Sequence, residues 1–435
     1  MKSTITLQLV RTCLCLSIGL AFCSIAQAQG LDSLERGRMK DMLSTLKKDI
    51  KNNYYDPNFH GIDLDKRFKE ASDKLDKATS SNQGLGIIAQ VLMDFNDSHL
   101  YFRPPPTTLA VEYGWRMLAI GDKIYITKVK PGSDAEAQGV KPGDQVLAVN
   151  NFPVNRKELW KINYYYQGLS KRDKLILTLL SPGQEKPRDV ALKSEIKKLQ
   201  KLMAFTTYYL SDEGFFREEN YEDRWAVTDK ATVWKMPSFV YDWDLVDGYV
   251  GRAKKSGTLI LDLRGNGGGY VKTMEGLIGN VIDHDVVISQ EVGRKKTEPS
   301  KSKSKEKSAF QGKLIVLIDS GSASASEVFA RAIQLEKRGI VLGDNSAGAV
   351  MTSLTFTEEH GDDSVVLYGA SIPIADVIMA DGKSLEHVGV TPDELILPTP
   401  ADMAAGRDPV LARALELADA KMSPEEIAKL YKYYW

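Results

Sequence analysis

The feature that most constrains the fold is a pair of nearly continuous apolar runs in the second half of the chain, Thr258–Leu263 and Lys313–Asp319. A strand with one face in solvent alternates apolar and polar residues, so uninterrupted runs are typical of strands buried on both faces. A third, shorter run lies at residues 340–342, and helical segments are expected between the runs, at 272–282 and 325–338. This alternation of strands and helices predicts an α/β core over residues 200–400.

The chain of 435 residues is long enough for two or three domains. Apolar residues recur at helical spacing through residues 29–103, which predicts an N-terminal helical domain, and Pro104–Pro106 mark its end. Residues 401–435 are expected to form a C-terminal helical tail. A lysine- and serine-rich stretch at 294–307 has no core-forming residue and is expected to be a solvated surface loop.

Residues 107–196 change to short β runs. The strand Lys123–Val129, a Pro-Gly-Ser turn, a short helix, a Lys-Pro-Gly-Asp turn and a strand at 145–149 follow one another. This order resembles a PDZ domain, and the resemblance implies that one loop supplies backbone N–H groups to the terminal carboxylate of a peptide that joins the sheet as a strand. That loop consists of Tyr113, Gly114, Trp115 and Arg116. The alternative is a PDZ-shaped lid that binds no peptide.

Residues 1–28 have the pattern of a secretory signal peptide, in which an apolar stretch ends at Ala26-Gln27-Ala28. All three cysteines lie in this segment, so a chain beginning at Gln29 has no thiol for a disulfide, a nucleophile or a zinc ligand. We therefore expect a periplasmic or secreted protein. A retained membrane anchor and a lipoprotein modified at Cys23 are the alternatives.

The charge balance argues against nucleic acid as a partner. The formal net charge is −1, and a chain beginning at Gln29 has 55 basic and 58 acidic side chains, because Lys2 and Arg11 precede it. A nucleic-acid-binding protein would need a basic surplus on one face. Clusters of Cys and His with metal-ligand spacing are absent from the sequence, so no metal or organic cofactor is expected.

The first candidate for chemistry is a serine cluster, Ser322, Ser324 and Ser326, between the second buried run and an amphipathic helix. A hydroxyl at a helix N-terminus lies beside free N–H groups and the positive end of the helix dipole, which stabilise an oxyanion. Ser324 is therefore a candidate nucleophile. The structural alternative is a capping box, because Glu327 follows Ser324 by three residues.

The second candidate is the glycine-rich segment Asp262–Gly269, which follows the first buried run. Glycines allow backbone amides to turn toward a ligand, which suits an oxyanion hole or a phosphate-binding loop. A phosphate-binding loop is disfavoured, because neither GxxxxGK[ST] nor a GxGxxG that opens a helix is present. An ordinary glycine-rich turn is the alternative.

The two segments, about 55 residues apart, together with the PDZ-like region resemble peptidase family S41, the C-terminal processing and tricorn-type serine proteases. The resemblance extends to Tyr54–Pro57 in the helical region. It implies an S41 α/β core of the ClpP/crotonase type with an inserted PDZ-like β domain. It also implies Ser324 as the nucleophile, and an oxyanion hole made by the backbone amides of Ala325 and of Gly267 or Gly268.

The general base is where this chain departs from the processing proteases. The family resemblance implies that processing proteases have a lysine base about 25 residues after the serine, and the corresponding residue here is Ala349. Tricorn-type members resemble this chain in a Ser-His pair and a glutamate, which match Ser98, His99 and Glu386. We expect His99 to act as the base, oriented by Glu386 through Ser98. His387 is the competing candidate, and an inactive member that lacks a base is the other alternative.

The resemblance thus implies an exported serine endopeptidase that hydrolyses protein or peptide substrates through an acyl-enzyme on Ser324. The PDZ-like domain would bind substrate termini or gate the site, and the chain would have no stable membrane span after removal of the signal. An alternative of another class is a non-catalytic S41-like protein that binds a peptide or a hydrophobic ligand, since retinoid-binding proteins share this fold.

Overall fold

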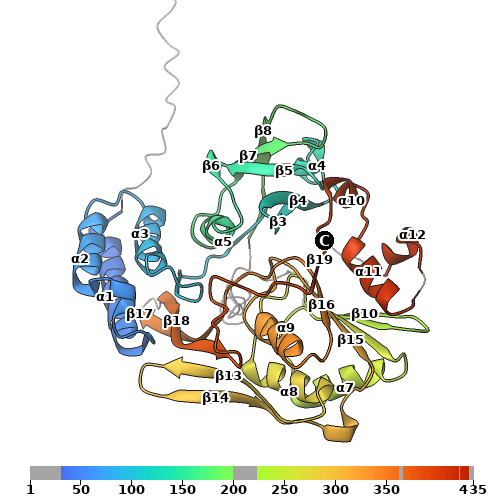
Figure 1. Ribbon diagram of the computed structural model, residues 1–435. Coiled ribbons are helices and arrows are strands. Elements are labelled where there is room, and N and C mark those ends of the chain that lie inside the picture. Colours follow the sequence, from blue (N-terminus) through green and yellow to red (C-terminus); the bar gives the residue numbers. More distant parts are fainter. Residues whose placement is uncertain (1–30, 199–222, 362–365, 421, 431–435) are drawn as a thin grey trace, which may run out of the picture.

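The computed structural model describes residues 31–198, 223–361, 366–420 and 422–430 (Figure 1). The predicted signal peptide, with its three cysteines, lies outside the described residues. Among the helices that the structure describes, none combines the length and the apolar character needed to cross a membrane.

The core is a six-stranded sheet in the order β10-β11-β12-β15-β16-β19, parallel except for the edge strand β10. The strands span Arg224–Val227 (β10), Thr232–Lys235 (β11), Thr258–Asp262 (β12), Lys313–Ile318 (β15), Ile340–Gly343 (β16) and Glu394–Leu395 (β19). The three apolar runs of the sequence are thus adjacent strands. The predicted α/β fold class is confirmed.

Helices cover both faces of this sheet (Figure 1). On one face lie α7 (Trp243–Ala253), α8 (Val271–Val281) and α9 (Ala325–Leu335), and on the other α11 (Pro409–Leu417) and α12 (Pro424–Ile427). Leu259 and Leu261 of β12 belong to the core on the first face, whereas Ile260 belongs to the core under α11. Alternate side chains of one strand therefore enter two cores, which explains the uninterrupted apolar run.

A second sheet is antiparallel and was not anticipated from the sequence. It has the order β1-β18-β13-β14, with β17 also paired to β18. Its strands are Tyr101–Arg103 (β1), Val286–Gly293 (β13), Thr297–Ser302 (β14), Met351–His360 (β17) and Val366–Met379 (β18).

The interpretation of residues 294–307 as a solvated loop is wrong, because β14 lies within that stretch. The Ser/Lys alternation follows the two-residue period of a strand, so that serines turn inward and lysines outward. Ser300 and Ser302 are buried, and their hydroxyls donate to the Glu275 side chain and to Glu275 O at 2.9 and 2.6 Å. The lysines of the stretch and the short helix η3 (Glu306–Ser308) are exposed, as expected.

The N-terminal helices pack against β17 and β18 (Figure 1). They are α1 (Ser33–Asn53), the short η1 (Phe59–Gly61), α2 (Leu64–Leu75) and α3 (Ser81–Met93), and the side chains of Asp32, Asp63 and Ser80 cap the three long ones. Because β1 pairs with β18, the end of this helical unit is part of the antiparallel sheet.

The PDZ-like region is a separate sheet in the order β3-β4-β5-β7-β8, drawn in cyan and green in Figure 1. Its strands are Trp115–Ile120 (β3), Lys123–Val129 (β4), Gln145–Val149 (β5), Phe152–Pro153 (β6, paired to β5), Lys174–Leu180 (β7) and Arg188–Lys193 (β8). Its helices are α4 (Asp134–Ala137), α5 (Leu159–Asn163) and the π-helical η2 (Tyr164–Leu169). The flanking pair β2 (Leu109–Glu112) and β9 (Glu195–Lys198) joins this sheet to the rest, and α10 (Pro400–Ala404) lies beside it.

Candidate active site

Ser324 lies in a sharp turn between the end of β15 and the start of α9. Its backbone has φ 56° and ψ −120°, a conformation that residues other than glycine rarely adopt. Ser324 N donates to Ala349 O at 2.8 Å and to Glu327 Oε2 at 3.0 Å, and these bonds hold the turn. The capping-box bond from Ser324 N to the Glu327 carboxylate is therefore present, but Ser324 itself is strained. Residues in such conformations cluster at active sites, so the capping and catalytic interpretations of this segment are compatible.

The three serines of the cluster differ in what their hydroxyls do. Ser322 and Ser326 are fully buried, and their hydroxyls donate to Leu263 O and Asn266 O, each at 2.8 Å. Ser324 is only partly buried. The outer two serines thus bind the glycine-rich loop to the helix start, and Ser324 is the member of the three with an accessible side chain.

The glycine-rich loop packs directly against Ser324. A Cβ on Gly268, whose φ is +107°, would lie 2.7 Å from the Ser324 Cβ and 3.0 Å from Ala325 N. Gly268 N donates to Asn266 Oδ1 at 2.9 Å, so this amide is already engaged. Of the two glycines considered for the oxyanion hole, Gly267 is therefore the one that we consider further, with Ala325.

Buried charged groups fix the base of this loop. Arg264 donates to both carboxylate oxygens of Asp262 and to both of Asp408, at 2.7 to 3.0 Å. Although burial opposes ionisation, Arg264 and Lys235 hold the pKa of Asp262 below its usual range. Asp319 Oδ1 accepts the backbone N–H groups that begin the two loops, Gly265 at 2.8 Å and Gly321 at 2.9 Å. One carboxylate thereby joins the glycine loop to the serine loop.

Ser98, His99 and Glu386 form a continuous hydrogen-bonded chain although 288 residues separate Ser98 from Glu386. Ser98 Oγ lies 2.8 Å from His99 Nδ1 and donates to Glu386 Oε2 at 2.8 Å, and Ser98 N donates to Glu386 Oε1 at 2.9 Å. The structure therefore brings together the three residues that the resemblance grouped.

The hydrogen bonds that join Glu386, Ser98 and His99 fix the tautomer of His99. Because the single Ser98 hydroxyl proton goes to Glu386, His99 Nδ1 must carry the proton of its own bond to Ser98, which leaves Nε2 as a proton acceptor. Burial lowers the pKa of His99, and the Coulombic effect of Glu386 opposes this in part. A neutral imidazole with an unprotonated Nε2 is the form that a general base requires.

One peptide group connects the turn that carries Ser324 to the hydrogen-bonded group of Ser98, His99 and Glu386. The carbonyl of Ala349 accepts Ser324 N at 2.8 Å, and the N–H of the same peptide group, on Val350, donates to Glu386 Oε2 at 2.8 Å. Ala349 itself is buried and offers no titratable group. Ser324 and Glu386 therefore hydrogen-bond to opposite edges of the same peptide group.

His387, the competing candidate, has other contacts. Its Nε2 lies 2.7 Å from Asn96 O and 3.5 Å from Glu386 Oε1, so it faces a carbonyl and a carboxylate. Three further histidines lie elsewhere: His60 beside Tyr55, His284 between Asp283 and Glu336, and His360 near Asp41.

Glu327 is the polar residue whose role sequence analysis understated. Its fully buried carboxylate accepts from Ser324 N, Ser346 Oγ, Gly348 N and Ala349 N at 2.6 to 3.0 Å. Burial raises its pKa to about 7 despite these bonds. The capping-box spacing was the available signal, but it could not show that the same carboxylate also holds residues 346–349.

A cavity of about 850 Å³ lies beside the candidate site, between the PDZ-like sheet and the core, and neither Ser324 nor His99 lines it. Tyr113, Gly114, Trp115 and Arg116 line it, together with Ser98, residues 347–349 and α5. Trp115 and Arg116 begin β3, which is the edge strand of its sheet, and Gly114 has φ +75° with Ser133 2.6 Å from the position of a Cβ. The edge strand β3 thus lines the same cavity as Ser98.

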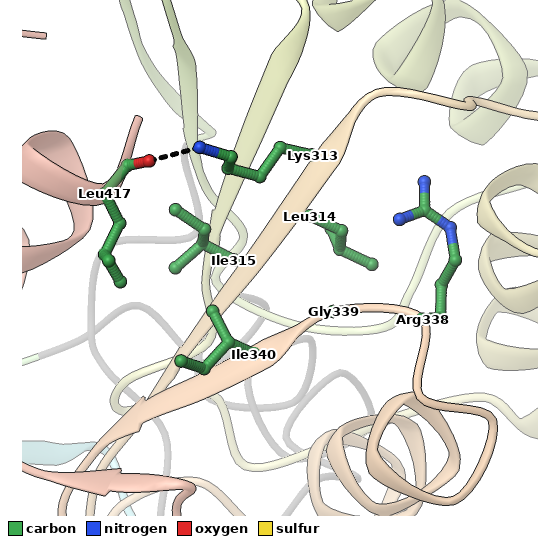
Figure 2. A pocket seen from close by; sticks show the side chains of 7 residues that line it. All are labelled: Lys313, Leu314, Ile315, Arg338, Gly339, Ile340 and Leu417. Atoms are coloured by element: carbon green, nitrogen blue, oxygen red, sulfur yellow. Dashed lines mark hydrogen bonds between the residues drawn. The ribbon is translucent and has the colours of Figure 1, made fainter. Parts of the chain in front are cut away.

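A second, smaller cavity of about 310 Å³ lies at the opposite end of the parallel strands, where β15 and β16 begin (Figure 2). Aliphatic side chains, Lys313 and Arg338 line it, and Lys313 Nζ donates to Leu417 O at 2.5 Å. In open α/β sheets ligands bind at the carboxyl ends of the strands, which is the end that carries Ser324. Within the described ranges no group of three or more His, Cys, Asp or Glu side chains could hold a metal ion.

Comparisons with known proteins agree with this geometry. Residues 235–396 match the model of peptidase family S41, and residues 107–159 match the PDZ domain. The chain is 26% identical to a carboxyl-terminal-processing protease of Synechocystis sp. over 61% of this chain and 57% of that protein. It is 32% identical to a putative tricorn protease homolog of Streptomyces coelicolor over 37% of this chain and 13% of that protein.

Solved structures share the fold. Mature CPAF superposes with a TM-score of 0.64 at 14% identity, covering 89% of this chain and 97% of that one. A photosystem II D1 C-terminal processing protease superposes with a TM-score of 0.52 at 18% identity, covering 83% of this chain and 93% of that one. The chain thus contains one region that matches peptidase family S41 and another that matches the PDZ domain. It spans about half the length of the curated relatives that it matches, for example 57% of the Synechocystis protease and 52% of a probable CtpA-like serine protease of Staphylococcus epidermidis.

Proposed function

We propose that this protein is a serine endopeptidase that hydrolyses peptide bonds through an acyl-enzyme on Ser324, with His99 as the general base. The observation that carries the proposal is the hydrogen-bonded chain from Glu386 through Ser98, because it leaves His99 Nε2 unprotonated. Curated relatives of the family named as proteases support the same chemistry.

In the first half of the reaction, His99 Nε2 takes the hydroxyl proton of Ser324 as Oγ attacks the peptide carbonyl carbon. The N–H groups of Gly267 and Ala325 stabilise the oxyanion, and one such donor is worth about 3 kcal/mol in other hydrolases. The protonated His99 then gives its proton to the leaving amine as the C–N bond breaks. Glu386, acting through Ser98, stabilises the imidazolium in this interval.

In the second half, water replaces the amine. His99 removes a proton from the water, the hydroxide oxygen attacks the acyl carbon, and the proton returns to Ser324 Oγ as the ester bond breaks.

A fluorophosphonate probe and peptide hydrolysis test this proposal together. We expect the purified protein to be labelled on Ser324 and to cleave peptides, and Ser324→Ala to lose both. Ser322→Ala and Ser326→Ala are matched controls, since their hydroxyls bind backbone carbonyls, and they should still be labelled while losing about 1 to 2 kcal/mol of stability. Equal loss of labelling in all three variants would contradict the assignment and point to a structural effect.

The PDZ-like domain is proposed to bind the C-terminus of the substrate. The N–H groups around Gly114 would receive the terminal carboxylate, and the preceding residues would pair with the free edge of β3. Because β3 and Ser98 line one cavity, a peptide bound in this way extends toward the catalytic chain.

Export is also proposed. The pattern of residues 1–28 supports removal by a signal peptidase, which would leave Gln29 as the first residue. N-terminal sequencing of the protein from its native host tests this, and a lipid-modified Cys23 would instead favour membrane anchoring.

A further inference from the structure

A second carboxylate lies next to the catalytic chain and has no part in the mechanism above. Asp97 immediately precedes Ser98, and its side chain is 3% exposed. Its Oδ1 accepts the backbone N–H of His99 at 3.0 Å, and its Oδ2 accepts the hydroxyl of Tyr54 at 3.0 Å. Asp97 Oδ1 thus binds the backbone of His99, and Asp97 Oδ2 is bound by Tyr54 of the N-terminal helical unit.

Tyr54 is a rigid support for this carboxylate. Its ring is completely buried and packs edge-on against Phe95, with ring centroids 5.3 Å apart. Nearby, His60 Nδ1 lies 3.0 Å from Phe95 O, and His60 Nε2 lies 2.9 Å from the Tyr55 hydroxyl. The motif that begins at Tyr54 therefore packs around the loop that leads from α3 to His99.

The backbone of this loop is held at several successive points. Asn96 adopts φ 51°, the left-handed conformation, which asparagine tolerates better than most non-glycine residues. His387 binds Asn96 O, His60 binds Phe95 O, and Asp97 binds His99 N, so each successive part of the loop has its own anchor. Of these anchors, Asp97 is the one in contact with the residue proposed as the base.

We propose that Asp97, held by Tyr54, is a positioning residue that fixes the backbone of His99 so that its imidazole meets both Ser98 and Ser324. The proposal rests on the proposed role of His99 as the base. It makes Tyr54, on the N-terminal helical unit, a structural component of the active site.

The charge of Asp97 is not what the proposal requires. Burial and the nearby Glu386 raise the pKa of Asp97 to about 7, while His99, Tyr54 and His60 oppose this. Both charge states are therefore populated near neutral pH, and in both Oδ1 can accept the His99 N–H. An asparagine, which keeps one carbonyl oxygen, should replace it far better than an alanine.

Four variants test the proposal by kcat, KM and the rate of fluorophosphonate labelling. Asp97→Ala should lower kcat and the labelling rate by about tenfold to a hundredfold, as small misplacements of catalytic groups do, with KM within about twofold. Asp97→Asn should keep kcat within about threefold, and Tyr54→Phe should fall between the two. Asp94→Ala is the matched control and should be unchanged, because this carboxylate of the same loop faces away and binds Arg67 and Gln90.

The outcomes separate this proposal from the proposed function. If His99→Gln retains hydrolysis, the base assignment fails and the positioning proposal fails with it. If His99→Gln is inactive while Asp97→Ala keeps its kcat, only the positioning proposal is overturned. An Asp97→Asn variant as impaired as Asp97→Ala would also overturn it, by showing that charge matters more than geometry. Should Asp97→Ala not fold, Tyr54→Phe decides, and an unchanged kcat in that variant overturns the proposal.

Discussion

Replacing Glu327 with glutamine should change how the stability of the protein depends on pH. Burial raises the pKa of Glu327 from 4.5 to about 7 in the folded state. The folded protein therefore binds this proton more tightly than the unfolded chain does. The resulting stabilisation is complete below about pH 4.5 and is lost as the pH rises toward 7.

The size of the effect follows from the width of this window. A difference of about 2.5 pKa units corresponds to about 3 kcal/mol, with a slope of about 1.4 kcal/mol per pH unit inside the window. Glutamine has no titrating proton, so the wild type should lose this amount relative to Glu327→Gln between pH 4.5 and 8. Glutamine also presents an N–H₂ group to two of the four donors that Glu327 accepts, so below pH 4.5 the variant should be less stable than the wild type by roughly 2 to 6 kcal/mol.

Urea unfolding of both proteins at a series of pH values measures the two free energies of unfolding. Titrations common to both proteins cancel in the difference, which isolates the contribution of Glu327. A difference that stays constant within about 0.5 kcal/mol from pH 4.5 to 8 would show that burial does not perturb this carboxylate, and the reasoning would be refuted.

Three further predictions concern activity. His99→Gln should cut turnover by several orders of magnitude and His387→Gln far less, and the reverse order in steady-state assays would show that the base is misassigned. Wild-type activity should rise with pH through an apparent pKa below 6.5, because burial lowers the pKa of His99. Amidating the C-terminus of a peptide substrate should lower kcat/KM, and equal values for the free acid and the amide would leave the PDZ-like domain as a lid. Gly268→Ala should abolish fluorophosphonate labelling, because its Cβ would lie 2.7 Å from the Ser324 Cβ, whereas Gly86→Ala, with open space at that position, should be labelled normally.

The parallel core was predictable because its signal is local. Strands β12 and β15 are buried on both faces, and that burial is written directly into their apolar runs. Strands β17 and β18 gave no such signal. Their sheet forms through pairing between distant segments, such as Tyr101 with Ser371, and side chains on β18 pack against helices some 300 residues earlier in the chain.

In the candidate site, too, the residues with a local sequence signal were predictable, whereas those placed by distant segments were not. Ser324 and the glycine loop could be located from their positions at the ends of buried strands. His99 could be suggested only by resemblance, because Glu386, which accepts from the neighbouring Ser98, lies 288 residues after that serine. Neither the tautomer of His99 nor the engagement of Gly268 N could be predicted, since each depends on which hydrogen bonds neighbouring groups have already made.

The structure also explains how alanine at position 349 is compatible with a catalytic site. Residue 349 contributes through its backbone: its carbonyl holds Ser324 N, and its N–H donates to Glu327 Oε2 at 2.9 Å. A lysine there would bring a long cationic side chain into a position where Ala349 is now 3% exposed. In the proposed mechanism His99, which follows the N-terminal helices, is the proton acceptor, so the proposed nucleophile and base come from different parts of the fold. Catalysis in this chain should therefore depend on docking of the helical unit against β18, an interface that a lysine base beside the nucleophile would not require.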